Sequence, residues 1–421
     1  MCGKIIVNNC YYSIMNVGGV TVNSNLSIVG EAVSSMRFLI FEMKTVCYNS
    51  YLYFGDSLGE ALTKLGHQVE YFKVDEDALD DLEQYIGKSY DALIDFNSDL
   101  PRALMDDDSY FLDHVDAPFF DVILDHPLYH HDTLKHKLNN FHVVCLDSLH
   151  KAYIEKYYPH IKSVTVTPMT GELAFGHDSI DWDNWELRPY DILFSGTYTD
   201  PVRIETAINK MPEIISENVY TLIDMMKADS TMTIEAAVDI LVENEFYEYI
   251  NSDKPLHTQT FYLADTYIRC LNRKKLVQAL DRTGYEFHLF GALWEELNLK
   301  HAELHREIPF NLTFTVFAKS KISVNIMPNF KAGSHDRVFS GQLNGAVSLT
   351  DSTTLLQSEY KDNQSILFYS LDDIDAVTEK VNSALSDPSN LKKIAQAGYD
   401  IASINHTWDN IAHKILFTIK N

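Results

Sequence analysis

A short segment in the second half of the chain combines residues that could bind an anion. It begins with an apolar, β-branched run at Ile322–Met327, which predicts a strand, and continues through a polar loop that contains Gly333. The predicted helix start that follows carries four candidate ligands, Ser334, His335, Asp336 and Arg337. The N–H groups and dipole of a helix N-terminus attract anions, and an arginine adds a fork of charged hydrogen bonds. The segment therefore predicts a phosphate-binding loop. The alternative is an ordinary helix capped by Ser334, with Arg337 as a surface cation.

Two other glycines follow apolar strands in the same half of the chain. Gly196 comes directly after the run at Asp191–Ser195. Gly291 comes directly after the run at Glu286–Phe290. The C-terminal ends of parallel strands meet at one edge of a sheet, where ligands bind. We therefore expect Gly196, Gly291 and Gly333 to lie around one ligand.

A histidine in the first half is placed for acid–base chemistry. The sequence Asp125-His126-Pro127 ends a predicted strand, and Pro127 keeps His126 extended so that its ring can point off the sheet edge. Histidine is the usual general base near neutral pH, and the neighbouring Asp125 would orient it. The alternative is that His126 caps the strand and bonds to the backbone.

Histidines also recur after this strand, at His126, His130, His131 and His136. They show neither the HExxH pattern nor a nearby cysteine pair at ligand spacing. We interpret this stretch as a polar loop and predict no metal site. A dinucleotide site is disfavoured as well, because the helix at Gly55–Gly66 lacks the GxGxxG pattern.

The elements that must position these residues alternate between strands and helices. Predicted strands lie at 37–43, 69–72, 90–96, 119–124 and 142–146, and then at 191–195, 286–290, 322–327, 346–349 and 366–369. Predicted helices lie at 55–66, 148–158, 214–226, 233–249, 261–283, 374–385, 391–402 and 408–419. This alternation predicts parallel sheets with the functional edge at the strand C-termini.

Changes in this pattern divide the chain into parts. We expect an irregular leader at 1–35, an α/β domain at 36–180, a second α/β domain at 188–402 with a helical insertion at about 202–283, and a C-terminal helix at 403–421. Between the domains, Ala174–Pro189 is predicted to be a linker anchored by Trp182 and Trp185.

Composition limits the partners. The chain has 421 residues, 46% of them hydrophobic, and a formal net charge of −26. This acidic balance argues against nucleic acid or an anionic membrane as the main partner, because either requires a basic surface. No apolar run reaches the length of a membrane span. The five cysteines are widely spaced without a CxxC pair, which is typical of reduced thiols in a cytoplasmic protein.

Several stretches of the second half resemble the GT-B glycosyltransferases, and within them the spore-maturation, CgeB-like group. They are DILFSGTY at 191–198, FHLFGALW at 287–294, VNIMPNFKAGSHDRVFSGQLNGAVSLTD at 324–351 and LSDPSNLKKIAQAGYDIASINHTW at 385–408. In the first half, ALTKLGHQVEYF at 61–72 and LDHPLYHH at 124–131 are similar to the acceptor-side domain of this group.

The resemblance implies two Rossmann-like domains that face each other across a cleft. The C-terminal domain would hold a nucleotide-diphosphate sugar, and the N-terminal domain would take the acceptor. Arg337 would offset the charge of the leaving diphosphate. The other residues implied in the donor site are Gly196, Thr197, Gly291, Asn325, Gly333, Ser334, His335, Asp336, Phe339, Ser340 and Asp351.

One position departs from the family pattern. Related retaining enzymes often carry a glutamate, which holds the ribose hydroxyls, where this chain has Ser340. A serine offers a single neutral contact, so donor binding would lose on the order of 1–2 kcal/mol unless Asp351 substitutes.

We therefore expect a cytoplasmic, metal-independent glycosyltransferase of the hexosyltransferase type that needs no cofactor. It would use a nucleotide sugar, most simply a UDP-sugar, and a protein or glycan acceptor, with His126, Asp125 and Arg337 as catalytic residues. A non-catalytic GT-B-like partner subunit and a sugar-nucleotide epimerase are the alternatives. The sequence does not indicate an oligomeric state.

Overall fold

The computed structural model describes residues 4–7, 10–13, 15–17, 20–22, 35–43, 50–74, 76–241 and 255–420. The chain divides into two compact units, Met1–Met36 and Arg37–Asn421. The first unit contains two antiparallel strand pairs, β1 (Lys4–Val7) with β2 (Cys10–Ser13) and β3 (Met15–Val17) with β4 (Val20–Val22). The rest of the leader predicted at 1–35 lies outside the described residues.

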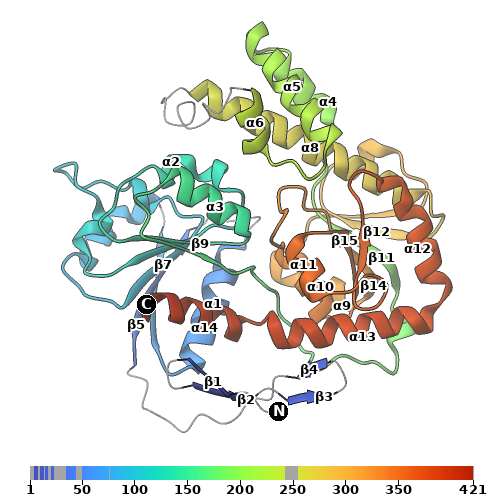
Figure 1. Ribbon diagram of the computed structural model, residues 1–421, viewed down its shortest axis with the longest axis horizontal. Coiled ribbons are helices and arrows are strands. Elements are labelled where there is room, and N and C mark those ends of the chain that lie inside the picture. The colour runs from blue at the N-terminus through green and yellow to red at the C-terminus, as the bar shows by residue number, and fades with distance from the viewer. Residues whose placement is uncertain are drawn as a thin grey trace. The chain divides into compact units, whose positions relative to one another are not determined.

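The second unit holds two six-stranded parallel sheets, and the first of them is built by the N-terminal half of this unit (Figure 1). Its strands in chain order are β5 (Arg37–Met43), β6 (Gln68–Val74), β7 (Ala92–Phe96), β8 (Phe119–Val122), β9 (Phe141–Cys145) and β10 (Ser163–Val166). Across the sheet the order is β10-β9-β8-β7-β5-β6. Its helices are α1 (Tyr51–Lys64), α2 (His131–Leu134) and α3 (Ser148–Tyr157). The strands β7 and β8 are completely buried, as expected for a parallel sheet covered on both faces.

The second sheet has the strand order β13-β12-β11-β14-β15-β16. Its strands are β11 (Tyr190–Ser195), β12 (Phe287–Phe290), β13 (Ala302–His305), β14 (Ser320–Val324), β15 (Val347–Asp351) and β16 (Leu367–Tyr369). This is the Rossmann order, in which the direction of strand succession reverses between β11 and β14. Ligands of such sheets bind outside the strand C-termini at that reversal.

Helices of the second half cover this sheet and continue past it. They are α9 (Thr313–Ala318), α10 (Asp336–Leu343), α11 (Thr354–Glu359), α12 (Val377–Ser386), α13 (Pro388–Asn405) and α14 (Trp408–Lys420). The last of them, α14, packs on α1 of the first domain (Figure 1). The Trp408 indole N–H donates to the Tyr53 hydroxyl at 3.1 Å, which joins α14 to α1.

A helical insertion separates β11 from β12. It consists of α4 (Pro201–Ile208), α5 (Glu213–Ala228), α6 (Ile234–Leu241) and α8 (Pro255–Asp281). Its apolar side chains, among them Leu222 and Val238, share one buried core with Tyr153 and Tyr157 of α3. The insertion therefore belongs to the second domain in sequence but packs on the first, and Lys156 of α3 pairs with Asp239 of α6 at 3.1 Å.

Short 3-10 helices connect many of these elements. They lie at Glu76–Tyr85, Leu100–Arg102, Phe111–His114, Pro127–His130, Trp185–Leu187, Trp294–Leu297, Phe310–Leu312 and Ile374–Ala376. Among the described residues, no helix is both long and apolar enough to cross a membrane.

The predicted elements differ from the structure mainly at the sheet edges. Both β10 and β13 were missed, because each has only four residues and lies at a sheet edge, where most of its side chains are only partly buried or exposed. The helix predicted at 233–249 is α6 up to Leu241, and its remainder lies outside the described residues. In the predicted linker, Trp185 is fully buried and its indole N–H donates to the Gly345 carbonyl at 2.6 Å.

Candidate active site

A cavity of about 740 Å³ lies where the C-terminal edges of the two sheets meet the insertion. Its first-domain wall includes Phe54, Asp125, Tyr129, His130 and Met169. Its second-domain wall includes Ser195, Gly196, Thr197, Gly291, Glu307, His335, Asp336 and Arg337, and α8 adds Tyr262, Arg269 and Arg273. The strand reversal between β11 and β14 thus opens into this cavity, as the topology requires.

Gly196 and Gly291 form the part of the wall where two strand ends touch. A side chain on Gly291 would place its Cβ 2.2 Å from the Gly196 carbonyl oxygen, and φ at Gly291 is +146°. Both N–H groups form hydrogen bonds between neighbouring strands. The Gly196 N–H donates to the Phe290 carbonyl at 2.8 Å, and the Gly291 N–H donates to the His305 carbonyl at 3.2 Å. These glycines therefore supply room at the cavity wall, and their own amides do not point at a ligand.

Three arginines line the cavity, together with the carboxylates of Asp125, Glu307 and Asp336. The Arg337 guanidinium donates to the Ser195 carbonyl at 2.9 Å, which holds it at the end of β11. Arg273 donates to the Thr197 carbonyl, and Arg269 lies 3.2 Å from the Asp265 carboxylate. Arginine pairs with phosphate oxygens through two parallel N–H bonds, so this group is suited to a diphosphate.

Arg269 and Arg273 were not predicted from the sequence. They lie four residues apart on α8, so they project from one face of the helix. That spacing is visible within the helix predicted at 261–283 and is the signal that could have identified them. What the sequence does not show is that the insertion folds back over the strand ends of the second sheet.

The start of α10 differs from the prediction in one respect. The N-cap is His335, whose ring accepts a hydrogen bond from the Arg337 backbone N–H at 3.5 Å, and not Ser334. The His335 ring also lies 2.5 Å from the Asp336 carboxylate. Burial alone would raise the pKa of Asp336, but the charge and hydrogen bond of His335 outweigh it and lower the pKa. An acidic side chain thus already occupies this helix N-terminus, and the arginines carry the attraction for an anion.

Gly333 does not line the cavity. It forms an isolated bridge with Asp147, and a Cβ there would lie 2.2 Å from the Leu146 carbonyl oxygen. The Asp147 carboxylate accepts a hydrogen bond from the Ala332 N–H at 2.7 Å. This corrects the placement of Gly333 beside the ligand, because Gly333 allows the two domains to approach each other. His335, Asp336 and Arg337 of the same segment do line the cavity.

Four other predicted donor residues are buried away from the cavity. Ser340 donates to the Asp336 carbonyl at 2.9 Å, and Phe339 stacks on His406 with 3.7 Å between ring centroids. Asn325 donates to the Thr350 hydroxyl at 3.0 Å. The fourth residue, Asp351, accepts from the Met327 N–H at 2.9 Å.

This burial bears on the predicted ribose contacts. Burial of the Asp351 carboxyl raises its pKa to about 6. Neither Ser340 nor Asp351 lines the cavity, so their ribose contacts stay a prediction that the cavity wall does not support.

On the acceptor side, Asp125 and His130 line the cavity. Asn97 at the end of β7 holds Asp125, because its amide donates to the Asp125 carboxylate at 3.3 Å and accepts from the Leu124 N–H at 2.8 Å. Burial lowers the pKa of His130, with a smaller opposing effect of Asp125. The His130 Nε2 atom is buried and has no hydrogen-bond partner within the described part of the chain. A neutral imidazole with a vacant nitrogen can accept a proton.

The His126 ring points elsewhere. Its Nδ1 accepts a hydrogen bond from the Leu128 N–H at 3.1 Å, and its Nε2 lies 3.3 Å from the Glu235 carboxylate of α6. Burial raises the pKa of Glu235, but the hydrogen bond and charge of His126 overcome this and lower it to about 2. The expectation that the His126 ring projects into the cleft is therefore corrected. His126 caps a 3-10 helix and ties the insertion to the first domain.

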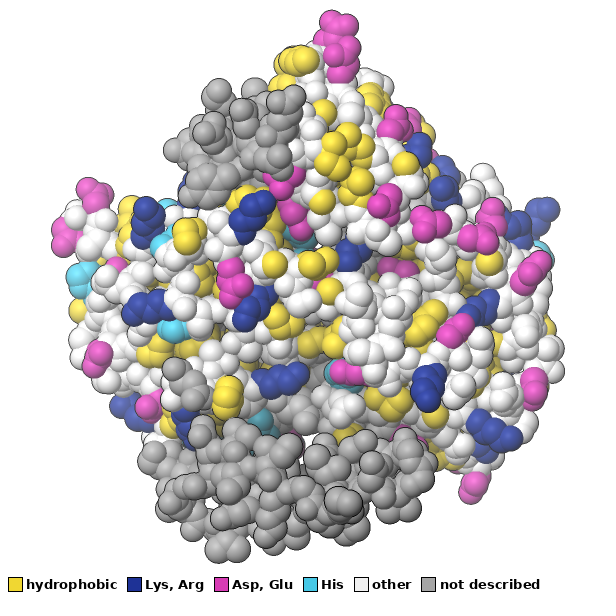
Figure 2. Space-filling view, in the orientation of Figure 1, with side chains coloured by type: hydrophobic (Ala, Val, Ile, Leu, Met, Phe, Trp, Pro, Cys, Tyr) yellow, Lys and Arg dark blue, Asp and Glu magenta, His cyan; other side chains and the backbone are white. Residues whose placement is uncertain are grey.

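On the face drawn in Figure 2, cationic and anionic side chains are mixed, with Lys and Arg interspersed among Asp and Glu. With a net charge of −26 on the chain, the field that favours an anionic ligand has to come from nearby groups. Within the described part of the chain, three arginines converge on this one cavity, where they can act on an anion at short range.

Residues 272–416 match the sequence profile of a family described as glycosyl transferase-like. No curated protein sequence matches the chain. The match covers most of the second domain after the insertion, from the end of α8 into α14.

Solved structures resemble the chain over nearly its whole length. Sucrose-phosphate synthase from Thermosynechococcus elongatus is 10% identical to the chain, with a TM-score of 0.52. The alignment covers 91% of this chain and 98% of the synthase. A glycosyltransferase from Rickettsia africae is 10% identical with a TM-score of 0.53, and the alignment covers 92% of this chain and 98% of that enzyme. HepE from Anabaena, solved with UDP and glucose, is 11% identical with a TM-score of 0.50, and the alignment covers 91% of this chain and 99% of HepE. The chain has the two-domain GT-B fold.

Proposed function

We propose that this protein transfers a sugar from a nucleoside-diphosphate donor to an acceptor hydroxyl. The observation that carries the proposal is the cluster of Arg269, Arg273 and Arg337 at the strand reversal of a Rossmann-type sheet. The glycosyl transferase-like match over 272–416 and the GT-B fold support the same reaction class.

The arginines would act on the leaving group. In the reaction, the acceptor oxygen bonds to the anomeric carbon while the bond from that carbon to the donor phosphate oxygen breaks. Negative charge then grows on the departing diphosphate, and fixed positive groups in a low-dielectric cavity stabilise it. Three guanidinium groups supply this charge from the chain itself, so we propose a reaction that needs no metal ion at the diphosphate.

The acceptor side would supply the base. We propose His130 in this role in place of His126, because its Nε2 is unpartnered among the described residues and its ring lines the cavity. It would take the proton from the acceptor hydroxyl as that oxygen attacks. Asp125, in the same wall, would favour the imidazolium that forms.

We propose uridine as the donor base and a protein or glycan as the acceptor. The HepE structure, whose fold this chain shares, holds UDP and glucose. The apolar part of the wall, with Phe54, Tyr129 and Phe310, suits the face of a sugar ring. We place the protein in the cytoplasm, because the two cysteines described, Cys145 and Cys270, are both free.

Ligand-dependent thermal unfolding tests the proposal. A ligand at 100 times its Kd stabilises the folded state by about 2.7 kcal/mol. We expect UDP and its sugars to raise Tm and uridine alone to leave it nearly unchanged, since the arginines recognise the diphosphate. Equal effects of uridine and UDP would contradict the diphosphate site. Product analysis without acceptor distinguishes a transferase, which releases UDP, from an epimerase, which returns a UDP-sugar.

A further inference from the structure

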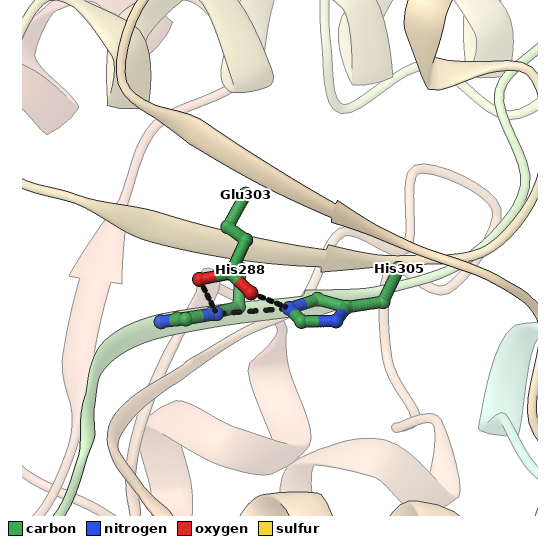
Figure 3. Close-up of side chains that lie close together, drawn as sticks. All are labelled: His288, Glu303 and His305. Carbon is green, nitrogen blue, oxygen red and sulfur yellow. Dashed lines mark hydrogen bonds and ion pairs between the residues drawn. The ribbon is translucent and has the colours of Figure 1, made fainter.

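His288, Glu303 and His305 converge at the outer edge of the second sheet (Figure 3). In the parallel pair of β12 and β13, His288 is in register with Glu303, and His305 follows two residues later on the same face. The His288 Nδ1 atom lies 2.9 Å from the His305 Nε2 atom. The Glu303 carboxylate lies 3.5 Å from each of these two nitrogens. Two imidazole nitrogens and a carboxylate oxygen therefore lie within 4.8 Å of one another.

From this geometry we propose a Zn²⁺ site formed by His288, Glu303 and His305. Zinc is bound tetrahedrally by histidine nitrogen and carboxylate oxygen at about 2.0–2.2 Å, which places neighbouring ligand atoms about 3.3 Å apart. The separation of 2.9 Å between the two nitrogens, and that of 3.5 Å from each nitrogen to a different oxygen of Glu303, lie close to that spacing. A water molecule would complete the fourth position.

The two rings are held in place without an ion. The Tyr190 ring lies 4.0 Å from the His288 ring, and the Phe290 ring stacks on His305 at 4.2 Å with 9° between planes. The second nitrogen of His288 faces the Glu286 carboxylate at 3.7 Å. A carboxylate on the far side of a ligating histidine is the usual outer partner in zinc sites, where it fixes ring orientation.

The exposure of the three side chains leaves a path for a metal ion to enter the site. The His288 side chain is only 4% exposed, whereas that of Glu303 is 54% exposed. An ion can therefore enter past Glu303 and reach a sheltered imidazole. None of the three residues lines the cavity, so the zinc would not touch the donor diphosphate.

The site would clamp two strands that contribute to the cavity wall. The His305 carbonyl accepts the Gly291 N–H at 3.2 Å, and Glu307 lines the cavity two residues beyond His305. Bridging β12 and β13 through an ion would hold these strand ends together. This role is independent of the transferase proposal, and its test does not depend on sugar transfer.

Equilibrium dialysis of metal-free protein against ZnCl2 tests the site, with metal content and Tm as readouts. We expect one equivalent of zinc and a higher Tm that EDTA reverses. The test variants are Glu303→Gln, at an exposed position, and His305→Phe, which keeps an aromatic ring on Phe290. His301→Gln, in the same β12–β13 connection, is the matched control for loss of a histidine.

Removing an outer partner of a zinc site typically weakens affinity about 10–100-fold, which we expect for Glu286→Gln. Glu303→Gln and His305→Phe should lose more than this, and His301→Gln should bind like the wild type. Co²⁺ in place of zinc should give the intense visible absorption of a tetrahedral site in the wild type and in His301→Gln, and not in Glu303→Gln or His305→Phe. Failure of the wild type to retain zinc, or unchanged affinity in both ligand variants, would overturn the proposal and leave a hydrogen-bonded histidine pair.

Discussion

Replacing Arg337 by glutamine should weaken donor binding selectively. The guanidinium lies at the end of β11, where it donates to the Ser195 carbonyl and faces the cavity. A hydrogen bond to a charged group contributes about 1.5–3 kcal/mol, which corresponds to about 10–150-fold in the Kd for UDP. Arg273→Gln should give a loss of similar size, because this side chain is held to the neighbouring Thr197 carbonyl.

Titration calorimetry of UDP against each variant measures these losses directly. Arg282→Gln is the matched control, since that arginine is exposed, pairs with Asp375 and lies outside the cavity wall. The glutamine variants lose side-chain hydrogen bonds at the cavity wall and none within a helix or sheet, so circular dichroism should show an unchanged fold. If both Arg337→Gln and Arg273→Gln bind UDP within twofold of the wild type, the assignment of the arginine cluster to the diphosphate is wrong.

Three further predictions concern the base, the domain contact and the insertion. His130→Gln should lower kcat about 10²–10⁴-fold with little change in donor Kd, and steady-state kinetics that show unaltered turnover would remove it as the base. Gly333→Ala should destabilise the protein by about 1–3 kcal/mol in urea unfolding, because its Cβ would meet the Leu146 carbonyl; equal stability would contradict the close contact. Glu235 has a folded pKa near 2, below its unfolded value, so its stabilisation of up to about 3 kcal/mol is present above pH 4.5 and disappears as pH falls towards 2. Wild type and Glu235→Gln should therefore converge in stability at low pH, and a constant difference would refute this assignment.

The parallel sheets could be predicted because their strands are short apolar runs bounded by glycine and polar turns. β5 matches its predicted range at both ends, and the other predicted strands differ by at most three residues at either end. The edge strands β10 and β13 could not be predicted, since each has four residues, pairs with a single neighbour and carries polar residues that are not fully buried. Omission of β13 also hid the convergence of Glu303 and His305 with His288, which depends on strand register.

The site was only partly predictable for a related reason. Arg337, Gly196 and Gly291 follow apolar strands, so the sheet topology brings them to one edge, and the sequence contains that information. Arg269 and Arg273 reach the same cavity through the path of the helical insertion, which local sequence does not specify. Ser340 and Asp351 were placed in the donor site by resemblance, whereas their hydrogen bonds to the Asp336 carbonyl and the Met327 N–H hold them in the core.

The most direct test of the central claim is mass-detected consumption of nucleotide sugars by the purified protein, with UDP-, GDP-, ADP- and dTDP-linked hexoses offered in parallel. The arrangement of the cavity predicts slow release of UDP from at least one UDP-hexose, with the sugar passed to water or an added acceptor. It also predicts that an Arg273→Gln, Arg337→Gln double variant loses this release. Absence of both binding and turnover for every donor, or full turnover in the double variant, would contradict a glycosyl-transfer site built on these arginines.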